Sequence, residues 1–182
     1  WEDLGNGYVT KRPKKKRTSA QIVAEPELGD EGKVRLRVNP QNAGPAPRIH
    51  YAEDAPVSES SPKLKEQTYT TNALRVNFLV CDPSGQYETG APVTWSNNLV
   101  LRNQLSDEGG VRKVALFVAP TGAIRYTLDG SEPRDGSIYE APISIGDGEV
   151  LLRAFAEADR LEAKKEFRFP AKGKTGVQID DV

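Results

Sequence analysis

The chain has 182 residues, with 25 Lys and Arg against 26 Asp and Glu, and 37% of its residues are hydrophobic. This length suits one or two domains with a modest apolar core. No stretch approaches the roughly 18 apolar residues of a membrane-spanning helix, so we expect no membrane partner. A single His and a single Cys cannot build the usual zinc site or an intrachain disulfide. These counts argue against metal-cluster and disulfide-rich classes, and we expect no metal and no cofactor.

The first 18 residues are strongly basic. They contain two acidic residues, Glu2 and Asp3, and six basic residues, which are Lys11, Arg12, Lys14, Lys15, Lys16 and Arg17. The absence of Met leads us to expect a piece of a longer polypeptide, in which residues 1–18 are the end of a preceding unit and a basic linker. Such a run can contact nucleic-acid phosphates. The alternative is a solvated linker, because no aromatic residue interrupts the run to stack on bases.

Two copies of one pattern follow, at residues 19–95 and 96–170. The segments Lys33–Pro40 and Lys113–Pro120 share Lys, Val, Leu, Val and Pro in the same places. Further matched pairs are Ile49 with Ile124, Tyr51 with Tyr126, Asp54 with Asp129, Leu74 with Leu151, Phe78 with Phe155, Val93 with Phe167, and Trp95 with Phe169. Changes of offset fall between these blocks, where loops absorb insertions. Residues 171–182 are expected to form a flexible tail.

The shared residues alternate as in half-buried strands. Val34, Leu36 and Val38 alternate with polar residues, and Ile124, Tyr126 and Leu128 do the same before a turn. Short strands with frequent turn signals predict an all-β chain of two tandem antiparallel sandwiches of the immunoglobulin or fibronectin III kind.

Matched aromatic residues are expected in the core of these sandwiches. We expect the pairs Tyr51 with Phe78, and Tyr126 with Phe155, to lie on facing sheets. The candidates that remain for stacking on sugars are Tyr69, Tyr87, Tyr139 and Trp95, and the case for such a site is thin. Strand edges such as Leu99–Asn103 are candidates for pairing with another chain.

The second copy resembles a known module. Tyr126-Thr127-Leu128-Asp129-Gly130-Ser131-Glu132-Pro133, followed by Tyr139, is similar to the turn of the chitobiase/β-hexosaminidase C-terminal type of immunoglobulin-like domain. The structural motif is carried by Tyr126, Asp129, Gly130 and Pro133. The first copy keeps Ile49, Tyr51 and Asp54 but has Ala55-Pro56 where Gly-Ser belongs. The resemblance implies an accessory domain without catalytic residues, and it speaks to fold more than to activity.

A second resemblance is to the C-terminal region of large bacterial ATPases of unknown function found near anti-phage defence systems. It rests on the Pro47–Pro62 run and the opening Trp-Glu-Asp-Leu-Gly-Asn-Gly-Tyr. No Gly-x-x-x-x-Gly-Lys-Ser/Thr motif occurs in the 182 residues, so ATP chemistry would belong to the rest of such a protein. This resemblance implies a cytoplasmic chain.

Candidate catalytic groups have plainer interpretations. The carboxylates near Asp129 lack the ligand spacing of an EF-hand, so we expect Asp129 to cap a turn in which Gly130 has positive φ. The pairs Asp30-Glu31 and Asp107-Glu108 recur before matched strands and are expected in exposed turns. His50 is expected on the polar surface of a strand. Cys81, which aligns with Ala158, is expected to be a small buried or half-buried side chain and not a nucleophile.

These observations predict a non-catalytic structural or interaction appendage of a larger bacterial protein, with a phage-defence ATPase as the expected parent. Its partners would be the parent's other domains and further proteins, with DNA bound through the basic segment. The alternative is an accessory region of a secreted glycan-degrading enzyme, supported by the turn motif. A third reading, that the chain is itself an enzyme, would need a pocket with perturbed titratable groups.

Overall fold

The computed structural model describes residues 2–3, 9–10, 14–27 and 32–173 of the chain. Its contacts divide the chain into two compact units. Unit 1 comprises Trp1–Glu25, Arg35–Thr71 and Arg75–Ser96, and unit 2 comprises Pro26–Val34, Asn72–Leu74 and Asn97–Val182. A two-residue ladder between β1 (Glu2–Asp3) and β2 (Val9–Thr10) precedes the first sandwich.

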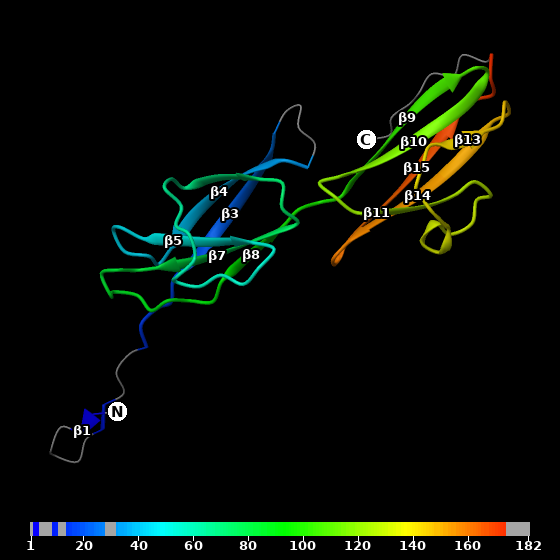
Figure 1. Cartoon of the computed structure of the whole chain (residues 1–182). Helices are drawn as coiled ribbons and strands as arrows, with labels where there is room; N and C mark the ends of the chain where they lie inside the picture. The colour runs from blue at the N-terminus through cyan, green and yellow to red at the C-terminus, as the bar shows by residue number, and fades with distance from the viewer. Residues whose placement is uncertain (1, 4–8, 11–13, 28–31, 174–182) are drawn as a thin grey trace. The chain divides into compact units, whose positions relative to one another are not determined.

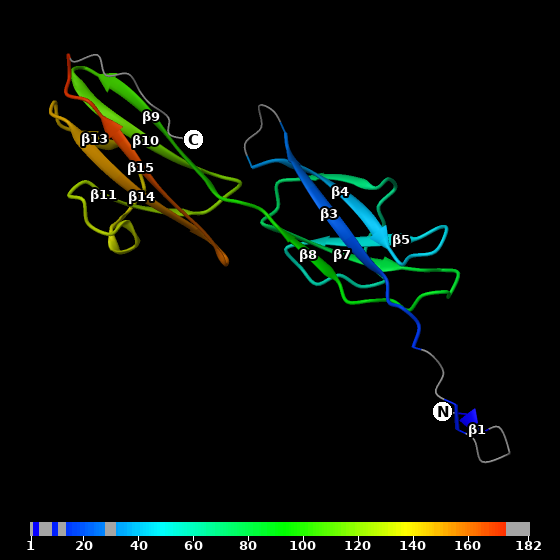
Figure 2. The same ribbon diagram turned by 180° about the vertical axis from the view of Figure 1, so that it is seen from behind.

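The first sandwich has two sheets of three strands each. One sheet has the order β3-β4-β6, from the strands Ser19–Pro26, Val34–Gln41 and Thr68–Thr71. The other has the order β5-β7-β8, from Arg48–Glu53, Arg75–Cys81 and Val93–Ser96. Figure 2 shows β3 beside β4, and β7 beside β8. Along β4 the expected alternation is confirmed, because Val34, Leu36 and Val38 are buried while Arg35 and Arg37 are exposed.

Unit 2 has two facing sheets of three and four strands (Figure 1). The first has the order β13-β10-β9, from Ile143–Ile145, Val111–Ala119 and Val100–Glu108. The second has the order β12-β11-β14-β15, from Ser137–Ile138, Ala123–Thr127, Val150–Ala158 and Leu161–Phe169. Buried residues of both sheets form one core, among them Leu116 and Ile143 on one side and Leu152 and Phe167 on the other. Fully burying each such side chain contributes about 1.5–3 kcal/mol.

Strand order is the same in the two sandwiches. β3-β4-β6 of unit 1 corresponds to β9-β10-β13 of unit 2, and β5-β7-β8 corresponds to β11-β14-β15, with the short β12 added at one edge. The pairs β9–β10, β11–β14, β14–β15, β5–β7 and β7–β8 are antiparallel, and the described residues contain no α-helix. The fold-class prediction of all-β, immunoglobulin/fibronectin III-like architecture is therefore confirmed.

Hairpins fix the register of unit 2. β9 and β10 pair over nine residues from Val100 with Ala119 to Glu108 with Val111, and the turn uses Gly109 and Gly110, both at positive φ. β14 and β15 also pair over nine residues, closed by Asp159 at φ 53°. A short 3₁₀ turn, η1 (Pro133–Asp135), lies in the loop between β11 and β12.

The expected placement of two aromatic pairs is wrong. Tyr51 and Phe78 lie directly opposite each other in one sheet, because β5 and β7 are hydrogen-bonded neighbours. Tyr126 and Phe155 also belong to one sheet, and they point to opposite faces of it, since Tyr126 pairs with Ala154 and Phe155 with Arg125. The alternation predicted for Ile124, Tyr126 and Leu128 also fails at its end, because β11 stops at Thr127 and leaves Leu128 exposed.

Candidate functional site

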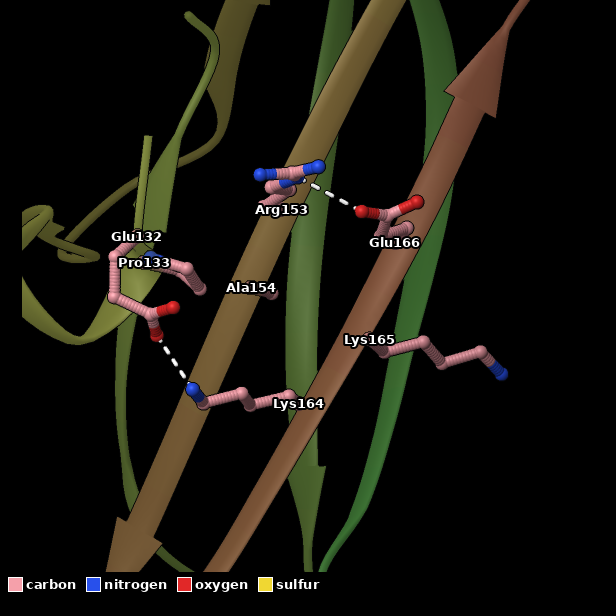
Figure 3. Close-up of a pocket in the computed structure, with 7 residues that line it drawn as sticks. All are labelled: Glu132, Pro133, Arg153, Ala154, Lys164, Lys165 and Glu166. Carbon is pink, nitrogen blue, oxygen red and sulfur yellow. Dashed lines mark ion pairs between the residues drawn. The ribbon is translucent and has the colours of Figure 1, made fainter. Parts of the chain in front are cut away.

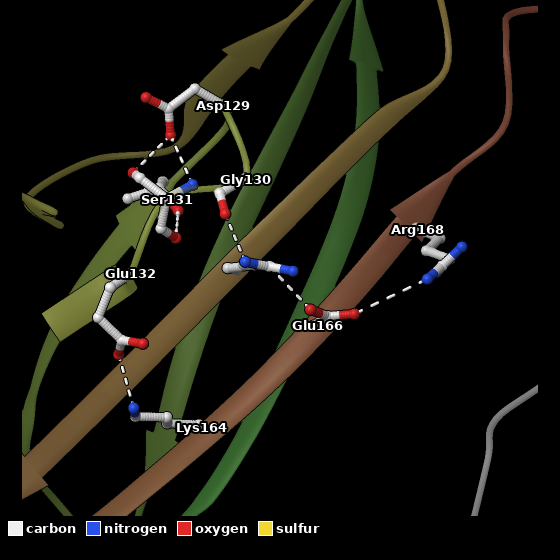
Figure 4. A network of polar contacts seen from close by, with 9 residues as sticks. Asp129, Gly130, Ser131, Glu132, Lys164, Glu166 and Arg168 are labelled. Atoms are coloured by element: carbon white, nitrogen blue, oxygen red, sulfur yellow. Dashed lines mark hydrogen bonds and ion pairs between the residues drawn. The ribbon is translucent and has the colours of Figure 1, made fainter.

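The turn singled out in the sequence begins where β11 ends. The Asp129 carboxylate accepts hydrogen bonds from the backbone N–H of Ser131 at 3.0 Å and from its hydroxyl at 2.6 Å (Figure 4). These bonds hold the pKa of Asp129 below its usual range, with the Ser131 hydroxyl as the largest cause. Gly130 has a φ of +81°, which an L side chain rarely adopts. The motif thus makes a tight Asx-type turn.

Beyond this turn, the loop folds back over the outer face of the four-stranded sheet. Pro133 starts η1 and is buried. The Arg134 guanidinium lies 4.6 Å from the centroid of the Phe155 ring and forms two hydrogen bonds with Glu162, at 3.0 and 2.6 Å. Phe155 is only 1% exposed, although it points away from the core between the sheets. The loop is what buries it.

Ion pairs connect the same loop to the two last strands. Glu132 pairs with Lys164 at 2.6 Å (Figure 4). Arg153 donates a hydrogen bond to the carbonyl oxygen of Gly130. Arg153 also pairs with Glu166 at 2.8 Å, directly across from it in the β14–β15 ladder. Opposite charges in this position stabilise a sheet modestly, by about 0.2–1 kcal/mol for each pair. We call this arrangement of loop, Phe155 and ion pairs the loop clamp.

A pocket of about 270 Å³ opens beside the loop clamp (Figure 3). Its lining residues are Glu132, Pro133, Arg153, Ala154, Lys164, Lys165 and Glu166. Two of its cations and both of its carboxylates are paired with each other. The pocket therefore has polar walls, and most of its charged side chains are neutralised by ion pairs with other lining residues.

The carboxylates of the loop clamp are poor candidates for acid–base chemistry. Hydrogen bonding from Lys164 lowers the pKa of Glu132, and hydrogen bonding from Arg134 lowers that of Glu162. A general acid at neutral pH needs the opposite shift, because it must keep its proton until the reaction takes it. The arrangement is suited to holding a loop on a sheet.

The repeated acidic turn is described only in unit 2, since Asp30 and Glu31 lie outside the described residues. Asp107 accepts from the backbone N–H of Gly110 at 3.0 Å and pairs with Lys172 at 2.9 Å. The hydrogen bond from Lys172 is the largest cause of its lowered pKa. Glu108 pairs with Lys113 at 2.6 Å. Both carboxylates are exposed and serve the turn.

The expectation that His50 lies on the surface is wrong, because it is only 3% exposed. Residues 62–64 run along β5, where the Tyr51 N–H donates to the carbonyl of Pro62 and the Leu64 N–H to that of Ile49. His50 Nδ1 lies 2.8 Å from the carbonyl oxygen of Ser61. The alternation of side chains along β5 does not predict the burial of His50, because residues 61–64, which cover it, have no strand pattern in the sequence.

Cys81 is buried at the end of β7, as its match with Ala158 predicts. Desolvation raises the pKa of its thiol. A thiolate is the reactive form of cysteine, so this environment opposes nucleophilic chemistry.

The basic segment is described from Lys14 onward, and Lys11 and Arg12 lie outside the described residues. Lys15 donates to the carbonyl of Gly85 at 2.6 Å. Residues 16–18 run beside Glu88, which accepts from the Thr18 N–H at 2.8 Å and donates to the Lys16 carbonyl at 3.1 Å. Residues 16–18 are therefore attached to the first sandwich through Glu88. The Arg17 side chain remains 74% exposed.

None of the four rings proposed for sugar stacking is exposed, because Tyr69, Tyr87, Tyr139 and Trp95 are all half-buried. Tyr69 lies 4.5 Å from Tyr51 between ring centroids and 6.4 Å from Phe78, inside the first sandwich. Tyr139 packs against Tyr126 in a T-shaped contact at 6.5 Å. These rings contribute to packing.

The structural role of Arg112 was not predicted from the sequence. Arg112 is buried on β10 and donates to the carbonyls of Gly146 at 3.1 Å, Gly148 at 2.9 Å, and Pro170. It thus holds the loop between β13 and β14 and the chain after β15. The sequence pattern that could have indicated this role is the position of Arg112 two residues before Val114, which places a charged side chain on the core-facing side of β10.

No group of three or more His, Cys, Asp or Glu side chains within the described ranges could hold a metal ion. Among the same residues, no helix is long and apolar enough to cross a membrane. The two facing sheets of unit 2, with their antiparallel ladders, define a β-sandwich module of the immunoglobulin or fibronectin III class.

Comparison with known families agrees with this class. Residues 114–165 match the family model described as "Fn3 associated". The match runs from Val114 in β10 to Lys165 in β15, so it includes the Asp129 turn and all of the loop clamp except Glu166. No curated protein matches the chain.

Proposed function

We propose that the chain is a non-catalytic interaction region of a larger polypeptide, in which two β-sandwich modules position partner proteins or DNA. The observation that carries this proposal is the loop clamp. In the loop clamp, the carboxylates are paired with neighbouring cations, and the pKa values of Glu132 and Glu162 are lowered. Side chains held in this way stabilise a surface and do not transfer protons.

The two modules are proposed to be copies of one ancestral domain. Support comes from their common strand order and from the sequence blocks that match between β4 and β10 and between β7 and β14. A duplicated module offers two similar surfaces on one chain, an arrangement suited to holding other proteins.

For the parent we propose a cytoplasmic bacterial ATPase of phage defence. The support is the Pro47–Pro62 run, which forms β5 and the segment that runs back along it. The chain carries no phosphate-binding Gly-x-x-x-x-Gly-Lys-Ser/Thr motif, so ATP hydrolysis would reside elsewhere in the parent. The exposed Arg17 and its neighbours Lys14–Lys16 are the surface proposed to contact DNA.

An accessory region of a secreted glycan-degrading enzyme is the second candidate. The Asp129–Pro133 turn and its resemblance to the chitobiase C-terminal module favour it. The half-buried state of Tyr69, Tyr87, Tyr139 and Trp95 weighs against a sugar-stacking platform on the described residues.

Immunoprecipitation of the native polypeptide from source cells distinguishes the two candidates. An antibody against this chain should recover a cytoplasmic polypeptide several times larger, with a phosphate-binding motif and defence proteins as companions. Recovery of a secreted glycosidase would refute the ATPase parent, and oligosaccharide binding by the chain would then become the next measurement.

A further inference from the structure

Thr18 lies where the basic segment meets the first sandwich. Its side chain is buried, with only 3% of its surface exposed. The hydroxyl accepts a hydrogen bond from the Gly90 N–H at 2.9 Å and donates one to the carbonyl oxygen of Val80. A buried hydroxyl that loses its partners costs free energy, so these two bonds favour a single position of Thr18 on the sandwich.

Gly90 is packed directly against the backbone of Thr18. A Cβ atom at position 90 would lie 1.9 Å from the Thr18 carbonyl oxygen, which is closer than two non-bonded atoms can approach. Gly90 is not among the glycines with positive φ. The chain therefore needs a glycine here for space and not for its backbone conformation, because a second backbone passes so close.

Further contacts hold the residues before Thr18. The Asn42 side-chain amide donates to the carbonyl oxygen of Arg17 at 3.4 Å, and the Lys15 ammonium donates to that of Gly85 at 2.6 Å. The two backbone hydrogen bonds with Glu88 add to these contacts. The backbone of residues 16–18 is thus fixed by the folded sandwich.

The cationic side chains of this fixed segment still face solvent. All four residues from Lys14 to Arg17 are exposed. Arg17 pairs with Glu88 at 3.8 Å, and both side chains are more than half exposed, so this pair is weak and screened by salt. The Lys15 ammonium has three donors, of which the Gly85 carbonyl takes one. The segment therefore presents positive charge that is complementary to a nucleic-acid backbone.

We propose that Thr18 is a positioning residue, which holds Lys14–Arg17 in the conformation that contacts the phosphates of DNA. The inference rests on the proposed DNA contact and identifies what prepares that same surface for its partner. A free basic segment loses backbone freedom when it binds, whereas folding of the first sandwich has already ordered this one. The fixed segment should therefore bind DNA more tightly than a free segment of the same charge.

Thr18→Val tests the proposal without removing a charge. Valine has nearly the shape of threonine but no hydroxyl, so both hydrogen bonds are lost. Fluorescence anisotropy with a labelled duplex should show affinity falling about tenfold, because the ordering cost now falls on binding. The slope of log affinity against log salt should change by less than about one, because the same cations are present. Thr18→Ser keeps the hydroxyl and should bind within about threefold of the wild type.

Thr71→Val is the matched control. Thr71 is another buried threonine of the first sandwich, at 4% exposure, and its hydroxyl donates to Glu53 instead. Its replacement should lower the melting temperature without weakening DNA binding, which separates positioning from a general loss of stability. Hydrogen exchange reports the release itself, because the Thr18 amide, bonded to the Glu88 carbonyl, should lose protection in Thr18→Val alone.

Gly90→Ala releases the segment by a second route, since the added Cβ meets the Thr18 carbonyl, and it serves if Thr18→Val does not fold. An unchanged affinity in a folded variant whose Thr18 amide has lost protection overturns the positioning role. A Thr18 amide that stays protected in both variants overturns the lock itself. Gln at Lys14, Lys15, Lys16 and Arg17 distinguishes the two proposals. If this variant weakens DNA binding and Thr18→Val does not, the DNA contact stands and the positioning role falls, whereas an unchanged affinity refutes both.

Discussion

Phe155 provides the sharpest test of the loop clamp. Its ring is 1% exposed on the outer face of β14, covered by η1 and by Arg134 at 4.6 Å. Truncating a buried Phe to Ala costs about 3–5 kcal/mol. We expect the lower end, about 3 kcal/mol for Phe155→Ala, because the cover is a surface loop into which water can enter. In a sandwich of this size such a loss lowers the melting temperature by roughly 12–24 °C.

The matched control is Phe117→Ala, on β10 of the same unit. Phe117 is 52% exposed, so its removal should change the free energy of unfolding by no more than about 0.5 kcal/mol. Urea unfolding followed by circular dichroism gives both values, and hydrogen exchange should show the amide of Gly136, bonded to the Pro133 carbonyl, losing protection only in Phe155→Ala. Equal effects of the two substitutions would refute the claim that the loop buries Phe155.

Three further predictions concern acid, the thiol and the basic segment. The folded-state pKa values of Glu132, Glu162 and Asp107 are lowered, so the stability that their ion pairs contribute is present at neutral pH. It is lost as the pH falls from about 4.5 through the folded pKa values, and a melting temperature that rises on acidification would contradict the ion pairs. Burial and a raised pKa should make Cys81 react with maleimide at least about tenfold more slowly in the native chain than in urea, and equal rates would show an accessible thiol. Replacing Lys14, Lys15, Lys16 and Arg17 with Gln should weaken duplex DNA binding and reduce the slope of log affinity against log salt by about 3–4. Lys63→Gln/Lys65→Gln is the control at another exposed, basic place, and an equal loss there would remove any special role for the segment.

The sequence predicts the strands well because the relevant physics is local. Period-two burial at Val34, Leu36 and Val38 follows from the alternation of side chains along a strand. The hairpin of β14 and β15 was distinguishable from a helix because the matching stretch of the first copy contains Pro83 and Gly85. The alternation of apolar and polar residues along one strand predicts which side chains face the core, but it does not predict which strands lie next to each other in the sheet.

Contacts with segments outside the regular strands explain the burial of His50, Phe155 and Arg112, which alternation along a strand does not predict. His50 and Phe155 lie on faces that a simple two-layer sandwich leaves to solvent, and each is buried by a segment outside the regular strands. Arg112 is a charge in an inward position whose three carbonyl acceptors come from distant parts of the chain. Partners so far apart in sequence leave no periodic signal near the residue itself.

Deleting this region from the proposed larger polypeptide tests the central claim most directly. An in-frame deletion of residues 16–173 should leave the parent's catalytic turnover intact and abolish its co-purification with partner proteins. Loss of turnover on deletion, with the remaining protein still folded, would contradict a non-catalytic interaction region. Turnover of any substrate by the isolated chain would contradict it as well.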